Sequence, residues 1–326
     1  MRKMKKLVIL VLACLCVMAC ALGFASCEDE TSNQSVGLSF VINEDGESYS
    51  VRGIGVCEER DIVIPATYKN KPVTGIEPLC FQRSTSINSV TIPNSVTTIG
   101  DGAFQECIGL KSVTIGNSVT TIRYGAFYKC NSLTSVTIGN SVTTIGKYAF
   151  SGCYRLVEVY NKSSLNITVG SSDYGCVGYY AKAVYTEPYT SQLSTDKNGY
   201  IIYTDGDVVS LIGYDEEKTD LTLPSNITEI NQYAFYYCSS LTSVTIGNSV
   251  TSIGEYAFYY CDGLTSVTIG NSVTSIGNSA FYNCRRLTSI TFQGTMEQWN
   301  AITKGSSWKY NVPASEVVCT DGTVAL

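Results

Sequence analysis

The sequence repeats itself with a period of 23 residues. Phenylalanine recurs at this spacing in two series, which are Phe81, Phe104, Phe127 and Phe150, and then Phe235, Phe258 and Phe281. Cysteine follows six of these residues at the same step, at Cys107, Cys130, Cys153, Cys238, Cys261 and Cys284. A fixed period of about 20 to 50 residues is the signature of a repeat architecture. We therefore expect stacked coils that share one hydrophobic core.

Each unit contains its own succession of elements. In the segment LTSVTI, residues 264–269, apolar and hydroxyl side chains alternate at the end, which predicts a short half-buried strand. The GNS of residues 270–272 predicts a turn, and residues 277–284 have the spacing of one short helical or 3₁₀ turn. No unit can bury its apolar face alone, so we expect stacking to place Leu, Val, Ile, Phe and Cys inside and Ser and Thr outside.

These units resemble the BspA-like leucine-rich repeats of bacterial surface proteins. The resemblance rests on the pattern AFxxCxxLxSVTIxxSVTxIG, which recurs through most of the chain after its leader. It implies a right-handed leucine-rich-repeat superhelix with a parallel sheet on its concave face. It also implies display on a cell surface. Together with the pattern of elements, it predicts an α/β repeat solenoid with β-hairpin caps and a mid-chain insert.

The repeats occupy two arrays, residues 77–160 and 223–294. Residues 36–76 predict an N-terminal β-hairpin cap, because they contain an Asp-Gly pair and an exposed terminal coil needs covering. Residues 161–222 are an insert that ends in what looks like a second hairpin start. Residues 295–326, which contain both Trp residues, predict a C-terminal cap. The spacing leaves open whether the arrays form one continuous solenoid or two hinged blocks.

Residues 1–26 have the layout of a secretory signal peptide, with a basic start, an apolar run and small residues before a cysteine. Their end resembles a bacterial lipobox, which implies lipidation of Cys27 and a polar tether over residues 27–35. Cys20 is a weaker alternative site, and plain secretion or a retained membrane helix are the alternatives to a lipid anchor. We expect a protein of the bacterial cell envelope that is lipid-anchored in the membrane and exposed at the surface.

Composition argues against several classes of function. The chain contains no His, which removes the commonest general base and metal ligand. Its net charge of −6 is unfavourable for nucleic acid. The repeated Cys have no CxxC or His partner, so core filling is expected, with a disulfide or a metal as the alternative. The Asp-Gly sequences lack the spacing of a calcium loop and are expected to be turns. We expect no enzyme, cofactor or metal site.

Two repeated surfaces are candidates for binding. The outward hydroxyls of the strands form a candidate binding face, namely Ser112, Thr114, Ser135, Thr137, Ser243, Thr245, Ser266, Thr268, Ser289 and Thr291. The tyrosine-rich turns form a candidate aromatic stripe, namely Tyr233, Tyr236, Tyr256 and Tyr259. Either set has a purely structural alternative, because Ser and Thr suit exposed strands and the rings can pack between neighbouring turns.

The expected function is non-catalytic adhesion to a protein partner in the host matrix or on a bacterial surface. Near-identical units favour multivalent contact over one deep pocket. The alternative is a carbohydrate-binding lipoprotein that captures glycan through its tyrosine rings. An enzyme would have to use the insert, which contains no recognisable catalytic set.

Overall fold

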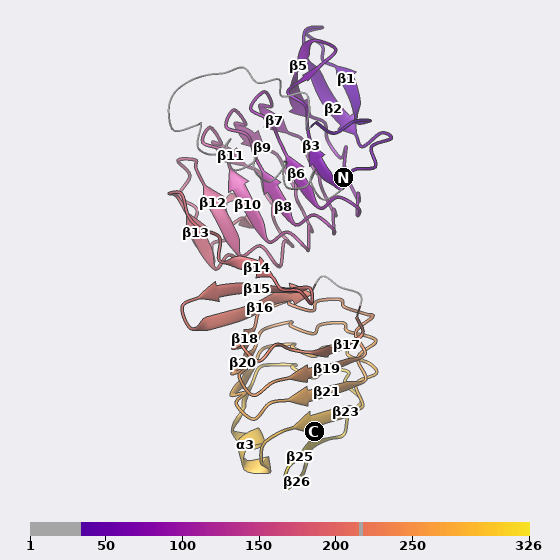
Figure 1. The fold of residues 1–326 in the computed structure, drawn as a ribbon, viewed down its shortest axis with the longest axis vertical. Helices are drawn as coiled ribbons and strands as arrows, with labels where there is room; N and C mark the ends of the chain where they lie inside the picture. The colour runs from indigo at the N-terminus through magenta and orange to yellow at the C-terminus, as the bar shows by residue number, and fades with distance from the viewer. Residues whose placement is uncertain (1–33, 215–217) are drawn as a thin grey trace, which may run out of the picture. The chain divides into compact units, whose positions relative to one another are not determined.

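The computed structural model describes residues 34–214 and 218–326. The predicted signal peptide, Cys20, Cys27 and most of the tether lie outside the described residues. Within them the chain is a parallel β-solenoid of about 12 turns with little helix, which confirms the predicted repeat solenoid (Figure 1). The two helices described are α2 (Asp173–Cys176) and α3 (Met296–Ala301).

Each array has two sheets rather than one, because every coil contributes two short strands. In the first array, the larger strands are ordered β3 (Asp61–Val63), β6 (Ser89–Thr91), β8 (Ser112–Thr114), β10 (Ser135–Ile138), β12 (Glu158–Asn161) and β13 (Ala183–Tyr185). Its other sheet is ordered β1 (Ser39–Ile42), β2 (Tyr49–Gly53), β5 (Lys71–Ile76), β7 (Thr98–Ile99), β9 (Thr121–Ile122) and β11 (Thr144–Ile145), and β4 (Thr67–Tyr68) pairs with β5.

The second array repeats this arrangement. One sheet is ordered β17 (Asp220–Thr222), β19 (Ser243–Ile246), β21 (Ser266–Ile269), β23 (Ser289–Phe292), β25 (Glu316–Cys319) and β26 (Gly322–Ala325). The other is ordered β14 (Leu193–Thr195), β15 (Tyr200–Asp205), β16 (Val208–Tyr214), β18 (Glu229–Ile230), β20 (Ser252–Ile253), β22 (Ser275–Ile276) and β24 (Thr303–Lys304). The strands of the repeats pair in parallel, with identical residues opposite one another, such as Ser243 and Ser266.

The repeated phenylalanines point into the core. All seven are buried, and neighbouring rings within each array stack with centroids 4.9 to 5.1 Å apart. The last ring, Phe281, packs against the edge of Trp308, and Trp308 and Trp299 are both buried in the segment after the repeats. The predicted interior is therefore confirmed, and a tryptophan takes the place of the next phenylalanine where the repeat stops.

The cysteines of the repeat fill the core beside these rings, as expected. All ten cysteines in the described ranges are free. The thiols of Cys107, Cys130 and Cys153 each lie 3.0 to 3.1 Å from the carbonyl oxygen of the phenylalanine one coil earlier, and those of Cys261 and Cys284 do the same. A small side chain that also donates to a buried carbonyl leaves no unsatisfied polar group there.

The helical turn predicted within each unit is wrong. In residues 254–261 the chain forms consecutive hydrogen-bonded turns, because Tyr256 (φ 55°) and Tyr260 (φ 56°) adopt the left-handed conformation, which a right-handed helix cannot contain. The N–H groups of Tyr256, Phe258 and Tyr260 donate to carbonyls of the next coil instead. These turns therefore stack on one another much as the strands do.

The two arrays have separate hydrophobic cores. None of the strand pairs among the described residues joins a sheet of one array to a sheet of the other. The arrays meet at a mixed junction, in which Val157 packs with the hairpin residues Ile201, Tyr203 and Ile212. The Arg155 side chain donates to the Ala234 carbonyl oxygen at 2.9 Å.

An ion pair completes this junction. The Lys182 ammonium lies 2.7 Å from the Glu229 carboxylate, and Ser210 donates to the same oxygen at 2.6 Å. Burial alone would raise the pKa of Glu229, but the hydrogen bonds from Lys182 and Ser210 and the Lys182 charge outweigh it, so its pKa lies below the ordinary 4.5. The carboxylate form is thus preferred in the folded protein.

Acidification is expected to weaken the junction. A carboxyl group whose pKa is lower when folded contributes stability above its unfolded pKa, and this contribution is lost as the pH falls through the folded pKa. Wild type should therefore be more stable than the Glu229→Gln variant near neutral pH, by on the order of 1 kcal/mol, and the difference should shrink below pH 4.5. Urea unfolding of both proteins across this range measures it, and a difference that stays constant would contradict the assignment.

Candidate functional site

The predicted binding face is a set of columns that run across the strands. Ser112 pairs with Ser135 and Thr114 with Thr137 in the first array. In the second array, the serines at 243, 266 and 289 and the threonines at 245, 268 and 291 form equivalent columns. The apolar residues between them are buried, whereas these hydroxyl residues are exposed or half-buried. The structure brings the predicted residues together within each array, on two separate sheets.

Other threonines, outside these columns, have a structural role. The hydroxyls of Thr97, Thr120 and Thr143 each donate to the carbonyl oxygen of the threonine 23 residues earlier, at 3.2 to 3.3 Å. Thr242 and Thr265 make the same contact in the second array, at 3.0 Å. These hydroxyls fasten one coil to the next. The sequence alone does not separate them from the hydroxyls of the binding face.

Hydroxyls of the binding face are largely uncommitted. Among the described residues, only Ser243 of the ten has a side-chain hydrogen bond, which it donates to the Asp220 carboxylate at 2.6 Å. The hydrogen bonds from Ser243 and Thr242 lower the pKa of Asp220. The other nine hydroxyls can hydrogen-bond with water or with a partner, because no described side chain or backbone group engages them.

The serine column of the first array ends at a residue that the sequence did not single out. Glu158 pairs with Ser135 and is completely buried. Its carboxylate accepts hydrogen bonds from the Ser191 hydroxyl and the Gln192 N–H, both at 2.7 Å. Glu158 therefore holds the segment before β14 against the edge of the binding face. No repeat signal could have revealed this, because residues 189–195 lie outside the period.

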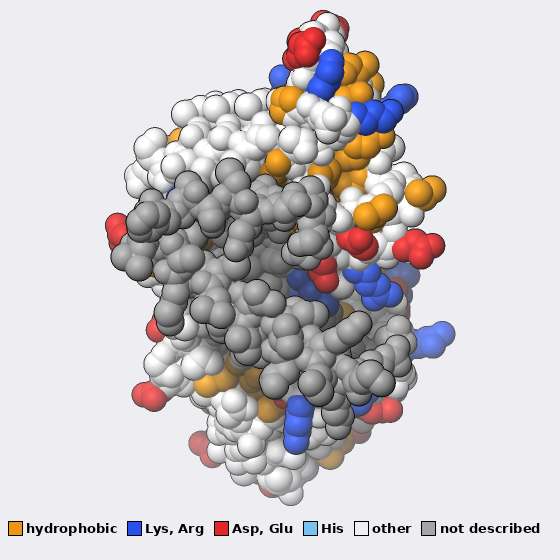
Figure 2. Space-filling model, turned by 45° about the horizontal axis from the view of Figure 1, so that its top comes forward, with side chains coloured by type: hydrophobic (Ala, Val, Ile, Leu, Met, Phe, Trp, Pro, Cys, Tyr) orange, Lys and Arg blue, Asp and Glu red, His pale blue; other side chains and the backbone are white. Residues whose placement is uncertain are grey.

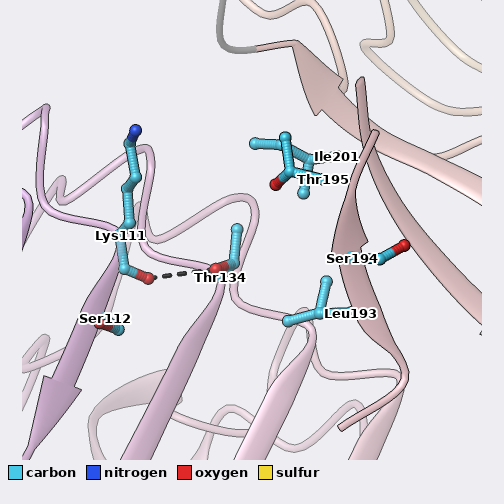
Figure 3. Close-up of a pocket in the computed structure, with 7 residues that line it drawn as sticks. All are labelled: Lys111, Ser112, Thr134, Leu193, Ser194, Thr195 and Ile201. Atoms are coloured by element: carbon cyan, nitrogen blue, oxygen red, sulfur yellow. Dashed lines mark hydrogen bonds between the residues drawn. The ribbon is translucent and has the colours of Figure 1, made fainter. Parts of the chain in front are cut away.

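Strand β14, which follows that segment, forms one wall of a groove of about 320 Å³ (Figure 3). The opposite wall comes from the first array through Lys111, Ser112 and Thr134, whereas β14 contributes Leu193, Ser194 and Thr195 and is joined by Ile201 of β15. In Figure 3 the Lys111 side chain and the pair Thr195 and Ile201 lie on opposite sides of the gap. Of the ten predicted residues, Ser112 lines this groove.

The lining of this groove combines hydroxyl side chains, the Lys111 side chain and apolar side chains. On the face shown in Figure 2, acidic and basic side chains are interspersed over the described residues.

The predicted aromatic stripe is a packed layer. The rings of Tyr233 and Tyr256 stack with centroids 5.0 Å apart, and those of Tyr236 and Tyr259 stack at 5.3 Å. Burial raises the pKa of Tyr233 and Tyr236 well above the usual value. Tyr233 is stacked between Tyr154 and Tyr256, and Tyr259 is stacked between Tyr236 and Tyr282, so these two rings offer edges rather than free faces. The rings of the stripe thus pack on one another, and a role of the stripe in binding stays a prediction.

Across residues 34–214 and 218–326, no group of three or more His, Cys, Asp or Glu residues could hold a metal ion. In the same ranges, neither helix has the length and apolar character needed to cross a bilayer.

Comparison with solved structures found leucine-rich repeat proteins of bacteria. A leucine-rich repeat protein of T. pallidum is 20% identical, covering 83% of this chain and 96% of that chain, with a TM-score of 0.36. A leucine-rich cell surface protein of Faecalibacterium prausnitzii is 23% identical, covering 85% and 99%, with a TM-score of 0.30. The pneumococcal vaccine antigen PcpA is 18% identical, covering 88% and 87%, with a TM-score of 0.39.

A search of curated proteins found no match to the chain. The family model described as "BspA type Leucine rich repeat region" matches six copies, over residues 74–176 and 214–306, which together make up more than half of the chain. This agrees with the resemblance seen in the repeat pattern. The chain belongs to the family of BspA-type leucine-rich repeat proteins.

Proposed function

We propose that this protein is a non-catalytic adhesion protein of the bacterial cell envelope that binds a protein partner in the host matrix or on a neighbouring bacterium. The observation that carries the proposal is the set of uncommitted strand hydroxyls, held in register at a fixed step. Threonine hydroxyls elsewhere in the same coils hydrogen-bond to the neighbouring coil, whereas the threonine hydroxyls of the binding face make no such bond and could contact a partner.

The geometry favours an extended polypeptide as the partner. The columns place identical hydroxyls on successive strands, about 4.8 Å apart in a parallel sheet. An extended chain that crosses the strands could hydrogen-bond to several coils in turn, so that many weak contacts add up. The groove beside Ser112, at the start of β8 and β10, would add apolar contact from Leu193 and Ile201.

Attachment to the membrane is part of the proposal. Cys27 would be the lipidated first residue of the mature protein, followed by the polar tether. Mass spectrometry of the mature N-terminus tests this, because a lipid-modified Cys27 supports the anchor and an unmodified or retained leader overturns it.

The binding face is tested by a pair of substitutions with a matched control. Thr114→Lys together with Thr137→Lys places two long charged side chains in one column of the face. Ser118→Lys together with Ser141→Lys makes the equivalent change in the exposed turns of the same two coils. We expect the first pair to weaken binding of the purified protein to an immobilised basement-membrane extract about tenfold or more, and the second pair to leave it unchanged.

Surface plasmon resonance measures this difference, and circular dichroism shows whether both pairs remain folded. Equal losses for the two pairs would mean that added charge, rather than the face, is responsible. Wild-type protein that binds neither the matrix extract nor intact bacterial cells would remove the basis of the proposal.

A further inference from the structure

The tyrosine layer of the second array has a gap where it would continue in the first. In the second array, two positions of the unit carry the rings of this layer, one just before the repeated Ala-Phe pair and one just after it. In the second array the position before the pair holds Tyr233, Tyr256 and Ser279. In the first array the same position holds Gly102, Gly125 and then Tyr148.

The backbone at this position is the same whether or not a ring is present. Gly125 has a φ of 59°, compared with 61° at Tyr148 and 59° at Tyr233. An added Cβ at Gly125 would meet only the Tyr128 Cβ, at 3.7 Å, which is ordinary van der Waals contact. Gly125 therefore differs from the tyrosines at the equivalent positions of other units by its missing side chain and not by its backbone conformation.

A tyrosine-lined hollow of about 440 Å³ lies at this point. It is lined by Gln105, Tyr124, Gly125, Tyr128, Tyr148 and Ser151. The volume lies within the range of small-molecule binding sites, about 300 to 1,000 Å³. The hollow belongs to the turns of the first array, and none of the Ser/Thr residues of the predicted binding face lines it.

Two rings around this hollow are more exposed than Tyr233 and Tyr256 of the second array. Tyr124 and Tyr148 are 56% and 40% exposed, and their rings meet edge to face, with centroids 5.7 Å apart and planes at 83°. Tyr148 has no parallel ring neighbour among the described residues, whereas Tyr233 and Tyr256 are stacked on each other. A flat ligand could take the stacking place that a tyrosine at position 125 would fill.

We propose that the tyrosine-lined hollow binds one pyranose residue of a glycan. A pyranose has an apolar C–H face that suits a tyrosine ring, and its hydroxyls need hydrogen-bond partners. The Gln105 amide and the Ser151 hydroxyl lie in the lining to meet them. The ammonium groups of Lys129 and Lys147 lie over the Tyr128 and Tyr148 rings, 5.3 and 4.7 Å from the ring centroids, so each already covers part of one ring face. An aromatic side chain of a protein partner would leave the Gln105 amide and the Ser151 hydroxyl unused.

The proposal is tested by filling the gap. Gly125→Tyr restores the side chain found at the equivalent position of three other units, and Ser279→Tyr makes the matched change in the second array, away from the hollow. The full-length mature protein is screened on an array of neutral and acidic oligosaccharides. The best-bound glycan is then titrated calorimetrically against each variant.

We expect saturable binding by wild type, a loss of about tenfold or more in Gly125→Tyr, and no change in Ser279→Tyr. Tyr148→Phe should bind like wild type, and Tyr148→Ala should not. This pair separates loss of the ring from loss of the hydroxyl, and it tests the hollow independently if Gly125→Tyr does not fold. Failure to bind any arrayed glycan, or equal binding by wild type and Gly125→Tyr, overturns the proposal.

Glycan binding in the hollow is independent of the proposed adhesion to a protein. The Thr114→Lys and Thr137→Lys pair should leave glycan binding unchanged, because neither residue lines the hollow. If Gly125→Tyr weakens binding to the matrix extract while no glycan binds, the hollow accepts a side chain of a protein and the pyranose assignment is wrong.

Discussion

Phe127→Ala is expected to lower the free energy of unfolding by about 3 to 5 kcal/mol. The Phe127 ring is fully buried and lies between two other rings, stacked at 5.1 Å from Phe104 and 5.0 Å from Phe150. Removing it leaves a cavity that neither neighbour can fill without giving up its own stacking, so the site cannot collapse easily. Urea unfolding followed by circular dichroism measures the loss.

The matched control is Ile108→Ala. Ile108 lies in the same array but is 48% exposed, so its removal should change the stability by no more than about 0.5 kcal/mol. Hydrogen exchange should show faster opening of the first array in Phe127→Ala and little change in the second, because the two arrays have separate cores. Similar losses for both substitutions would contradict the buried position of the ring.

Deleting one whole repeat is expected to leave the protein folded, whereas deleting one residue more is expected to disrupt the second array. Removal of residues 252–274 joins Thr251 to Ser275, which pairs directly with Ser252 and takes its place in register. Each coil contacts mainly its neighbours, so the loss of one coil shortens the stack without changing its pattern.

Removal of residues 252–275 joins Thr251 to Ile276 instead. A one-residue shift turns buried side chains outward at that strand, because side chains alternate between the two faces. We expect the 23-residue deletion to keep a cooperative thermal transition and a circular dichroism spectrum like that of wild type. We expect the 24-residue deletion to lose the thermal transition of the second array. A folded 24-residue deletion would show that the register is not fixed by the buried residues.

The periodic parts of this fold could be predicted from the sequence because each residue there has an identical neighbour. Val267 stacks on Val244 and on Ile290, so the local alternation and the 23-residue step together fix both the strand and its partner. The phenylalanine core follows from the same argument. The columns of the binding face follow as well, since their register is that of the buried residues beside them.

The local conformation of the turns could not be predicted in this way. Apolar residues three and four positions apart suggested a helical turn, but Tyr256 and Tyr260 adopt positive φ and direct alternate N–H groups to the next coil. Non-glycine residues seldom adopt this conformation. It is kept here because the same hydrogen bonds recur in neighbouring coils, which is information about stacking rather than about one segment.

The repeat pattern also could not predict the junction between the arrays or the sites beside it. Glu158 occupies the position at which the neighbouring strands have serine, and its partners Ser191 and Gln192 come from a segment without periodicity. The hollow at Gly125 is a local omission from a regular layer. Comparing the units with one another points to Gly125, but only the structure shows that the neighbouring rings leave the space open.

The buried thiols of the repeat affect how the protein reacts with oxidants and alkylating reagents. Burial raises the pKa of Cys107, Cys130 and Cys261, which keeps them in the unreactive thiol form. While the coils stay closed, an oxidant or an alkylating reagent has little to attack at these positions. An unfolded chain would expose all of them at once, so the modification of these sulfur atoms records whether a given molecule has ever opened.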